Sequence, residues 1–419
     1  MSTSLPGHIN RLVNLRAMTG VRWVCLLLAT LAAQTAYAGN TSTLPAGAFI
    51  LDESWLEADT TVQWSSTRRP LTLLPGIDRY EPGGGLQGTI TASPYVRYRF
   101  LVSQLFLGLT DKLTLAVGVP LVTSTTIAPN FGWKPGDYQS NLGRKYSEDD
   151  FWQWAKSMGQ PKPTAFDGNH YTLADIVVGL RWRLPDFSVL QTTGVQAALA
   201  AQVAIPTGVT QDPEHLVAAG TTLWELNNYG DAEVHLALDR PFKVDGVQRL
   251  SFGIDAWYSW FRERTFVTPK GTNSPLLLTY APYVGETYRV DPGDFVAVTA
   301  MVEVAPLLGP TWATFASGYS LEKANNFPPL LNLTFGHSYI TVSQSRFYSQ
   351  SAVWNWDREK LWLPGDKNTV RLGADISLLR MGLPVQFYTQ YRNQEWVAGR
   401  NTRASNIFVA GVRLIMKFW

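Results

Sequence analysis

Apolar and polar residues alternate along several segments of this chain with the period of two that β-strands require. In the segment GDAEVHLALD (230–239), the even positions are apolar, whereas most odd positions carry carboxylates or a histidine. The segments LTLAVGVPL (113–121), DIVVGLRWRL (175–184) and VRLGADISLL (370–379) alternate in the same way. No long segment after residue 38 shows a convincing helical period. The pattern predicts an all-β protein.

Strands with one apolar and one polar face occur both in soluble β-sandwiches and in outer-membrane barrels. The lengths of the connections separate the two, and here short connections alternate with long polar ones, as in a barrel with short periplasmic turns and long extracellular loops. We therefore predict a transmembrane antiparallel β-barrel, with a secreted soluble all-β protein as the alternative. The short connections are 108–112, 184–194, 240–246, 306–310 and 380–384, and the long ones are 127–170, 207–229, 264–292, 322–367 and 397–404.

The alternating segments predict about twelve strands, and an even number returns both termini to the periplasm. Residues 330–357 could add a hairpin and make fourteen, and the first segment could instead be a plug. The predicted strands are 46–63, 90–107, 112–126, 171–184, 194–206, 230–241, 247–263, 293–305, 311–321, 368–380, 384–397 and 404–418.

The last residues, NIFVAGVRLIMKFW (406–419), continue the alternation and end on two aromatic rings. Counted back from Phe418, an apolar face lies opposite Arg413 and Lys417. This ending resembles the closing strand by which the barrel-assembly machinery recognises outer-membrane proteins. The resemblance implies that Phe418 is the assembly signal, that this machinery is a partner, and that Trp419 is an appended residue.

The N-terminus predicts export. Three arginines precede the apolar run WVCLLLATLAA, and Ala36 and Ala38 have the spacing that signal peptidase requires. We therefore predict a cleaved signal peptide at 1–38, with Met18 as an alternative start, and a barrel at 39–419. Cleavage leaves 35 minus 3, or 32, basic residues against 33 acidic ones, and it removes Cys25, the only cysteine. Such a mature chain is unsuited to nucleic-acid binding, disulfides or thiolate zinc sites.

Catalytic motifs do not emerge from the sequence. His337 and Ser338 are adjacent, so they point to opposite faces of a strand and cannot act as a lipase pair. The glycine run GGG (83–85) is followed by LQGTI and not by a helix that could receive a phosphate. We predict a protein that is not an enzyme, with no catalytic residues, no cofactor and no metal site.

The strand face opposite the apolar one carries charges of both signs in many strands. A lumen of this kind can hold ion pairs or offer polar contacts to a solute. We interpret these residues as lining the lumen and not as ligands of a particular solute: Arg97, Arg99, Asp175, Arg181, Arg183, Glu233, Asp239, Arg249, Asp255, Glu303, Arg371, Asp375, Arg392 and Arg413.

The long extracellular loop 127–170 contains SEDDFWQWAKSMG (147–159), in which Ser147 and Asp150 have the spacing of a helix start and apolar residues follow at helical spacing. A short helix here could pack on its own barrel, or it could help to bind a hydrophobic solute at the barrel mouth. The rings of this candidate access site are Trp133, Tyr138, Phe151, Trp152 and Trp154.

Several strand sequences together resemble one outer-membrane family. They are YEPGGGLQGTITASPYVRYRF (80–100), LTDKLTLAVGVPLVTS (109–124), DIVVGLRWRL (175–184) and QAALAAQVAIPTG (196–208), followed by the aromatic closing strand. The resemblance is to the family named for the meta-pathway of phenol degradation. It implies a β-barrel in the outer membrane of a Gram-negative bacterium that passes aromatic or hydrophobic compounds, and it carries over no binding residues.

The identity of the solute and the oligomeric state are left open by these patterns. A structural or adhesive barrel without transport is the alternative function. We expect a channel or transporter-like barrel for small aromatic or hydrophobic solutes, in contact with outer-membrane lipid.

Overall fold

The structure is a computed structural model, and it describes residues 41–71, 74–81, 83–139, 143–157, 162, 165–168, 171–185, 188–208, 231–244, 247–268, 281–307, 328–349, 351 and 364–417. The predicted signal peptide and the predicted assembly signal, Phe418, lie outside these residues.

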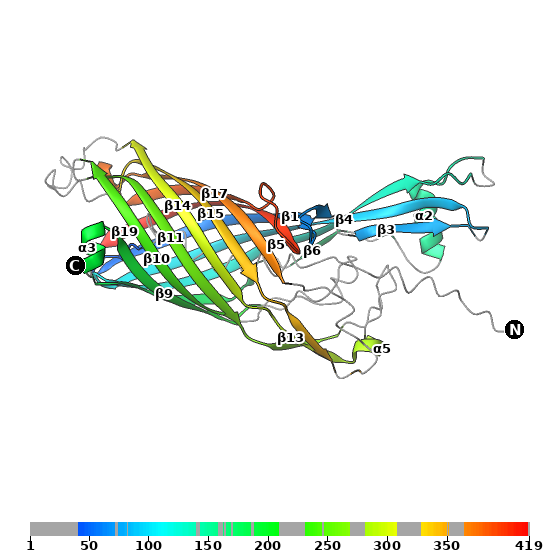
Figure 1. Ribbon diagram of the computed structural model, residues 1–419, viewed down its shortest axis with the longest axis horizontal. Coiled ribbons are helices and arrows are strands. Elements are labelled where there is room, and N and C mark those ends of the chain that lie inside the picture. The colour runs from blue at the N-terminus through cyan, green and yellow to red at the C-terminus, as the bar shows by residue number, and fades with distance from the viewer. Residues whose placement is uncertain are drawn as a thin grey trace.

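Twelve strands of the described chain form one closed antiparallel barrel (Figure 1). Each wall strand pairs with the wall strands that precede and follow it in sequence, and the first pairs with the last, which closes the wall. The prediction of an all-β barrel of about twelve strands is therefore confirmed. The wall strands are β1 (Ala48–Trp64), β4 (Leu86–Thr110), β5 (Leu113–Pro135), β8 (Ile176–Arg183), β9 (Gln196–Ile205), β10 (Asp231–Val244), β11 (Val247–Phe261), β14 (Phe295–Leu307), β15 (Leu331–Val342), β17 (Gly365–Ser377), β18 (Val385–Asn393) and β19 (Thr402–Lys417).

The ninth wall strand differs from the prediction. The predicted strand 311–321 falls outside the described residues, and β14 pairs directly with β15, so 311–321 cannot be the next strand of the wall. The sequence NLTFGHSYITV supplies this strand because its alternate residues can face lipid and lumen. The connection after β14 consequently runs from 308 to 330 and is not the short turn 306–310. The described residues give a wall of twelve strands, and no further hairpin from 330–349 enters it.

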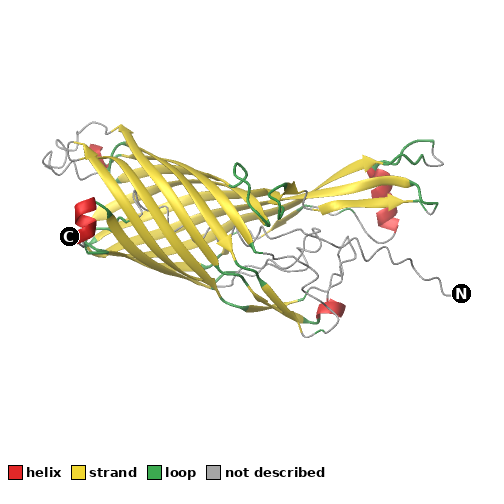
Figure 2. Ribbon diagram, in the orientation of Figure 1, coloured by secondary structure: helices red, strands yellow, loops and turns green. Residues whose placement is uncertain are grey.

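Short turns and long loops lie at opposite rims of the barrel, which we call the turn rim and the loop rim. The turn rim carries both ends of the described chain and two short helices, α3 (Ser188–Thr193) and η2 (Leu379–Met381). Figure 2 shows that the helices occupy connections and not the wall. None of the helices in the described part of the chain has the length and apolar character that a transmembrane helix requires. Elements of the loop rim are β2 (Pro70–Leu71), β3 (Leu74–Tyr80), α2 (Glu148–Ser157), β6 (Phe166–Gly168), β7 (Thr172–Leu173), β12 (Arg264–Val267), α5 (Ala281–Val284), β13 (Thr287–Asp291) and β16 (Arg346–Ser349).

The outer face of the wall forms an apolar belt. Every second residue of a strand points outward, and in these strands most of the outward residues are apolar. Many large apolar side chains there are exposed over more than a third of their surface, which a water-soluble fold would bury. Examples from seven strands are Leu180, Leu236, Ile254, Val298, Phe335, Ile376 and Phe387.

Two wall strands are much longer than the others, and they extend past the loop rim as an arm (Figure 1). β4 has 25 residues and β5 has 23, whereas roughly 9–11 tilted residues suffice to cross a membrane. β3 pairs with the distal part of β4, and helix α2 lies against this arm. Residues 127–135, which the sequence assigned to a loop, are the continuation of β5.

Candidate functional site

The inner face of the wall is polar, and it contains most of the charged residues that the sequence predicts to line the lumen. Seven of them are less than 10% exposed, and five are partly buried. Their role in lining a solute path stays a prediction. The buried set is Glu233, Asp239, Asp255, Glu303, Arg371, Arg392 and Arg413, and the partly buried set is Asp175, Arg181, Arg183, Arg249 and Asp375.

One polar cluster lies at the seam where the first and last strands meet, and we call it the seam cluster. Arg413 of β19 stands directly opposite Asp52 of β1, and its Nε donates to Asp52 Oδ2 at 2.8 Å. Tyr388 of β18 donates its hydroxyl to Asp52 Oδ1 at 2.8 Å, and its ring lies 4.0 Å from the Arg413 guanidinium. The Arg413 Nη1 also lies 3.5 Å from Asp375 and 3.4 Å from Gln386. The cluster therefore joins four consecutive strands, β17, β18, β19 and β1, across the closure.

A second cluster, the histidine cluster, lies on β9, β10 and β11. The two ring nitrogens of His235 each lie 3.3 Å from a carboxylate oxygen, Nε2 from Glu233 and Nδ1 from Asp255. Glu233 also accepts hydrogen bonds from Gln202 and from the Ser259 hydroxyl. An imidazole donates from both nitrogens only when it is protonated, so this geometry favours the imidazolium form.

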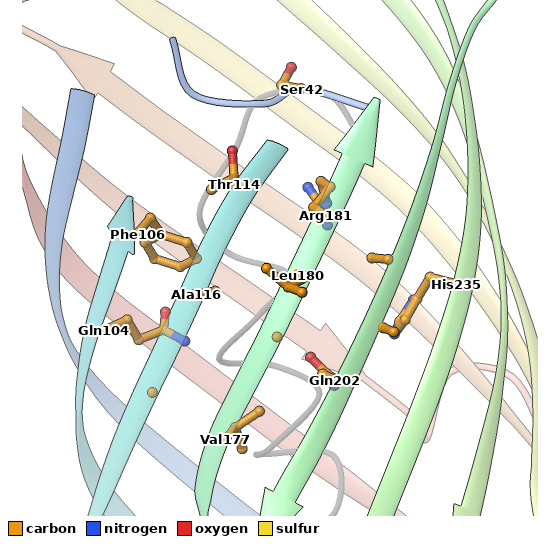
Figure 3. A pocket seen from close by; sticks show the side chains of 14 residues that line it. Ser42, Gln104, Phe106, Thr114, Ala116, Val177, Leu180, Arg181, Gln202 and His235 are labelled. Carbon is orange, nitrogen blue, oxygen red and sulfur yellow. The ribbon is translucent and has the colours of Figure 1, made fainter. Parts of the chain in front are cut away.

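Between the two clusters the inner wall carries small side chains, and a cavity lies against it (Figure 3). The cavity has a volume of about 50 Å³ and lies within about 630 Å³ of space outside the protein atoms, which includes open solvent. Ala116 and Gly118 of β5, Gly179 of β8 and Ala200 of β9 form its floor. Figure 3 shows Phe106 and Gln104 at one side of this floor and Gln202 and His235 at the other. We call this space the wall cavity; it also reaches Ser42, Thr114, Val177 and Arg181.

The segment 41–47 lies at the end of the wall cavity that is closest to the turn rim. Its Leu44 donates a backbone hydrogen bond to Thr114 Oγ1 at 2.8 Å, and the side chain packs in one buried group with Ile50 and Phe106. Ser42, which precedes this anchor, lines the cavity. The wall cavity is therefore narrowed at its turn-rim end by residues that come before the first strand.

Arg97 and Arg99 lie on the outer face of the wall, so the prediction that they line the lumen is wrong. They share the outer face of β4 with the exposed Leu101 and Leu105, while Tyr98 and Phe100 between them are buried inside. Both arginines pair with Glu57 of β1, at 3.4 Å and 2.8 Å. They tolerate an outward position because they lie toward the loop-rim end of the wall, beyond the apolar residues.

The partly buried predicted residues include some that lie at the ends of strands. Asp175 precedes β8 and accepts a hydrogen bond from the Gly208 backbone at 2.9 Å, so it joins the start of β8 to the residues that follow β9 at the loop rim. Arg249 donates to the Ala305 carbonyl at 3.4 Å near the turn rim. The wall cavity is lined by only one of the fourteen predicted lumen residues, Arg181.

The predicted access-site rings gather on the arm. Phe151 packs against Trp133, Trp152 and Trp154 with ring centroids 4.9–5.8 Å apart. Tyr138 stacks on Tyr146 at the adjacent end of β5. These contacts hold helix α2 to the strands, and a role of the rings in solute binding stays a prediction.

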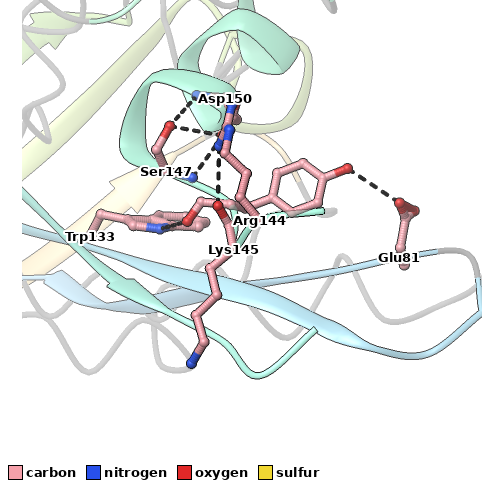
Figure 4. A network of polar contacts seen from close by, with 7 residues as sticks. Glu81, Trp133, Arg144, Lys145, Ser147 and Asp150 are labelled. Carbon is pink, nitrogen blue, oxygen red and sulfur yellow. Dashed lines mark hydrogen bonds and ion pairs between the residues drawn. The ribbon is translucent and has the colours of Figure 1, made fainter. Parts of the chain in front are cut away.

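Polar contacts fix the start of α2 on the same arm (Figure 4). The Asp150 carboxylate accepts from the Ser147 backbone at 2.8 Å, and the Asp150 backbone donates to the Ser147 hydroxyl at 3.3 Å, which is a capping box. Arg144 donates to both Asp150 oxygens, and its hydrogen bonds hold the pKa of that carboxyl well below its usual range. The Ser147 and Asp150 spacing in the sequence had indicated this helix start.

Four residues of the two clusters and the wall cavity were missed from the sequence. Asp52 escaped because its neighbours on the inner face of β1, Ile50 and Leu56, are apolar, so the strand has no clearly polar face. Tyr388, Gln104 and Gln202 are uncharged, and the search for lumen residues followed charge. Gln104 and Gln202 could have been identified from their place in the alternation, because each lies on the same strand face as the neighbouring inward residues. Among the described residues, no group of three or more His, Cys, Asp or Glu side chains could hold a metal ion.

Comparison with known proteins bears on the fold. No model of a protein family matches the sequence, and no curated protein sequence matches it. An outer-membrane channel from Pseudomonas putida F1 superposes with a TM-score of 0.51 at 9% identity, covering 91% of this chain and 100% of that one. The translocator domain of the autotransporter NalP from Neisseria meningitidis gives a TM-score of 0.43 at 11% identity, covering 96% and 99%. A variant of TodX, a monoaromatic hydrocarbon channel, gives 0.35 at 11% identity, covering 93% and 92%.

The first of these likenesses, together with the closed wall and its apolar belt, identifies the chain as an outer-membrane β-barrel of Gram-negative type. The turn rim then faces the periplasm and the loop rim faces the exterior. The apolar belt meets the lipid of the membrane.

Proposed function

We propose that this barrel is a channel that passes small aromatic or hydrophobic compounds through its lumen. The observation that carries the proposal is the wall cavity. At the wall cavity, the inward positions of β5, β8 and β9 include Ala116, Gly118, Gly179 and Ala200, whereas the opposite wall holds Arg371, Arg392 and Arg413. A path along the small residues can accommodate an apolar molecule opposite a wall that carries polar and charged groups.

Two further points support the proposal. A solved structure with the same fold is an outer-membrane channel. The strand sequences also resemble the outer-membrane family of the meta-pathway of phenol degradation, whose members are expected to pass such compounds. The proposal assigns the barrel no catalytic activity, no cofactor and no metal.

The alternative is a structural or adhesive barrel, and the arm is the observation that favours it. An arm of three strands and a helix beyond the loop rim is more than a channel wall requires. An adhesive barrel needs such an exposed surface but no continuous path through the wall.

Uptake into vesicles separates these functions. The purified barrel, inserted into liposomes, is expected to admit toluene and benzyl alcohol faster than protein-free liposomes do once their passive permeation is subtracted, and to admit a disaccharide poorly. Equal rates with and without the barrel for every aromatic compound would leave the adhesive function as the better account.

A further inference from the structure

The floor of the wall cavity is flat, because its residues carry at most a methyl group. Ala116 lies opposite Gly179 across the β5–β8 pair, and Gly118 lies diagonally beside it. A flat wall of backbone atoms makes many van der Waals contacts with one face of a planar ring, and fewer with a branched or globular molecule. The floor therefore favours a planar ligand.

The width of this floor suits a single ring. Phe106 of β4 and Gln202 of β9 occupy the same row of paired residues as Ala116 and Gly179, one at each side. Neighbouring strands lie about 4.8 Å apart, so the backbones of these two residues are separated by three spacings, or about 14 Å. Their side chains take up part of that span and leave room for one ring.

Amide groups stand at both sides of the floor. Gln202 uses its Nε2 to donate to Glu233, which directs the amide oxygen away from that carboxylate. Figure 3 draws the Gln202 oxygen on the side of β8 and places Gln104 at the other side of the floor. A ligand hydroxyl could therefore donate to the Gln202 amide oxygen without disturbing the histidine cluster.

The charges around the cavity favour an uncharged ligand. Of the residues that line it, Arg181 and His235 can carry a positive charge. Glu233 and Asp255 do not line the cavity, but each is bonded to one ring nitrogen of His235, so the charge of the imidazolium is compensated within the histidine cluster. An aromatic carboxylate next to His235 would therefore also approach two carboxylates, which costs energy in a low dielectric.

From these observations we propose that the wall cavity is a binding site for a planar, single-ring, uncharged molecule that carries one hydroxyl or similar hydrogen-bonding group. Gly179 provides the floor, and Gln202 provides the hydrogen bond that distinguishes such a molecule from a bare hydrocarbon. This inference rests on the proposed channel function and adds the residues that select the solute.

The test compares the parent barrel with two variants and a matched control in liposomes, using benzyl alcohol, toluene and benzoate as probes. Gly179→Val fills the floor, since even a Cβ there would lie 3.1 Å from the Gln202 Cβ, and it should lower the uptake of both uncharged probes about tenfold. Gln202→Leu removes the acceptor and should lower the benzyl alcohol to toluene ratio about threefold to tenfold. Gly373→Val is the control, because it also adds a side chain to an inward glycine but lies outside the cavity, and it should match the parent.

Each outcome separates the site from the channel function. Heat-modifiable migration on gels establishes that a variant is folded, and Gly179→Ala replaces Gly179→Val if the larger residue prevents insertion. If the parent admits the probes and all variants match it, the site is wrong and the channel stands. If benzoate is the preferred probe and Arg181→Met abolishes its uptake, the ligand is an anion and the inferred class is overturned. If the parent itself does not exceed protein-free liposomes, the proposed function fails, and this inference fails with it.

Discussion

Arg413→Met should destabilise the barrel far more than Arg99→Met, although both arginines pair with a carboxylate of β1 at 2.8 Å. The two pairs differ in burial. The side chains of Arg413 and Asp52 are 2% and 0% exposed, whereas those of Arg99 and Glu57 are 42% and 22% exposed. Removing one partner of a buried pair leaves the other charge without compensation and costs about 3–5 kcal/mol. Removing one partner of an exposed pair costs less than about 1 kcal/mol.

A double variant shows how much of the stability lost in Arg413→Met comes from the uncompensated charge of Asp52. After Arg413→Met, Asp52 keeps the Tyr388 hydroxyl at 2.8 Å but loses its counter-ion. Asp52→Asn in the same chain removes the uncompensated charge, so the pair of changes should recover about 1–3 kcal/mol relative to Arg413→Met alone.

Urea titration of the barrel in phospholipid vesicles measures these free energies, with tryptophan fluorescence and gel migration as two readouts. The reasoning is refuted if Arg413→Met and Arg99→Met reduce the free energy of unfolding by the same amount. It is also refuted if the double variant is less stable than Arg413→Met alone.

Three further predictions test other parts of the structure. Gly411→Ala should cost about 1–3 kcal/mol in the same titration, because its Cβ would lie 2.5 Å from the Tyr388 ring. Gly373→Ala should be close to neutral, because the nearest atom to its Cβ would lie at 3.4 Å. Equal losses of stability would argue against this position of the Tyr388 ring. Ala374→Arg on the lipid face should cost about 2–4 kcal/mol if it lies near the membrane midplane, and Asp375→Asn should cost less; the reverse order would mean that the faces of β17 are inverted. Asp150→Ala should remove about 1 kcal/mol of α2 stability, seen as faster amide exchange in 148–157. The folded-state pKa of Asp150 lies below its ordinary value of 3.8, so its contribution is complete above that value and is lost as the pH falls through the folded pKa; loss of protection already between pH 7 and pH 5 would contradict this.

The sequence predicted the barrel because alternation and connection lengths are both local patterns. The outward set Val234, Leu236 and Leu238 and the buried Glu233 and Asp239 follow the predicted parity of β10. The ninth strand was misplaced because 311–321 and 331–342 both alternate, and only pairing with β14 decides between them.

The candidate site was less predictable, because it depends on which strands lie side by side and on positions where those strands carry small side chains or none. Arg97 and Arg99 were placed inside because they lie opposite an apolar face in the alternation, but β4 continues past the apolar belt, where an outward charge has Glu57 as a partner. The floor at Gly118 and Gly179 is defined by missing side chains on paired strands. A search for charged residues in the sequence has no means of finding it.

Thiol accessibility inside and outside the wall tests the central claim, a solute path along β9, most directly. The only cysteine, Cys25, lies in the predicted signal peptide, so a new cysteine in the mature chain has no background. Ala200 lines the wall cavity from the inner face, whereas Val203 is exposed on the outer face and does not line the cavity. In single-channel recordings, a charged, membrane-impermeant thiol reagent should reduce the current of Ala200→Cys and leave that of Val203→Cys unchanged. An unaltered current for Ala200→Cys, with its modification verified by mass, would contradict a path along this wall.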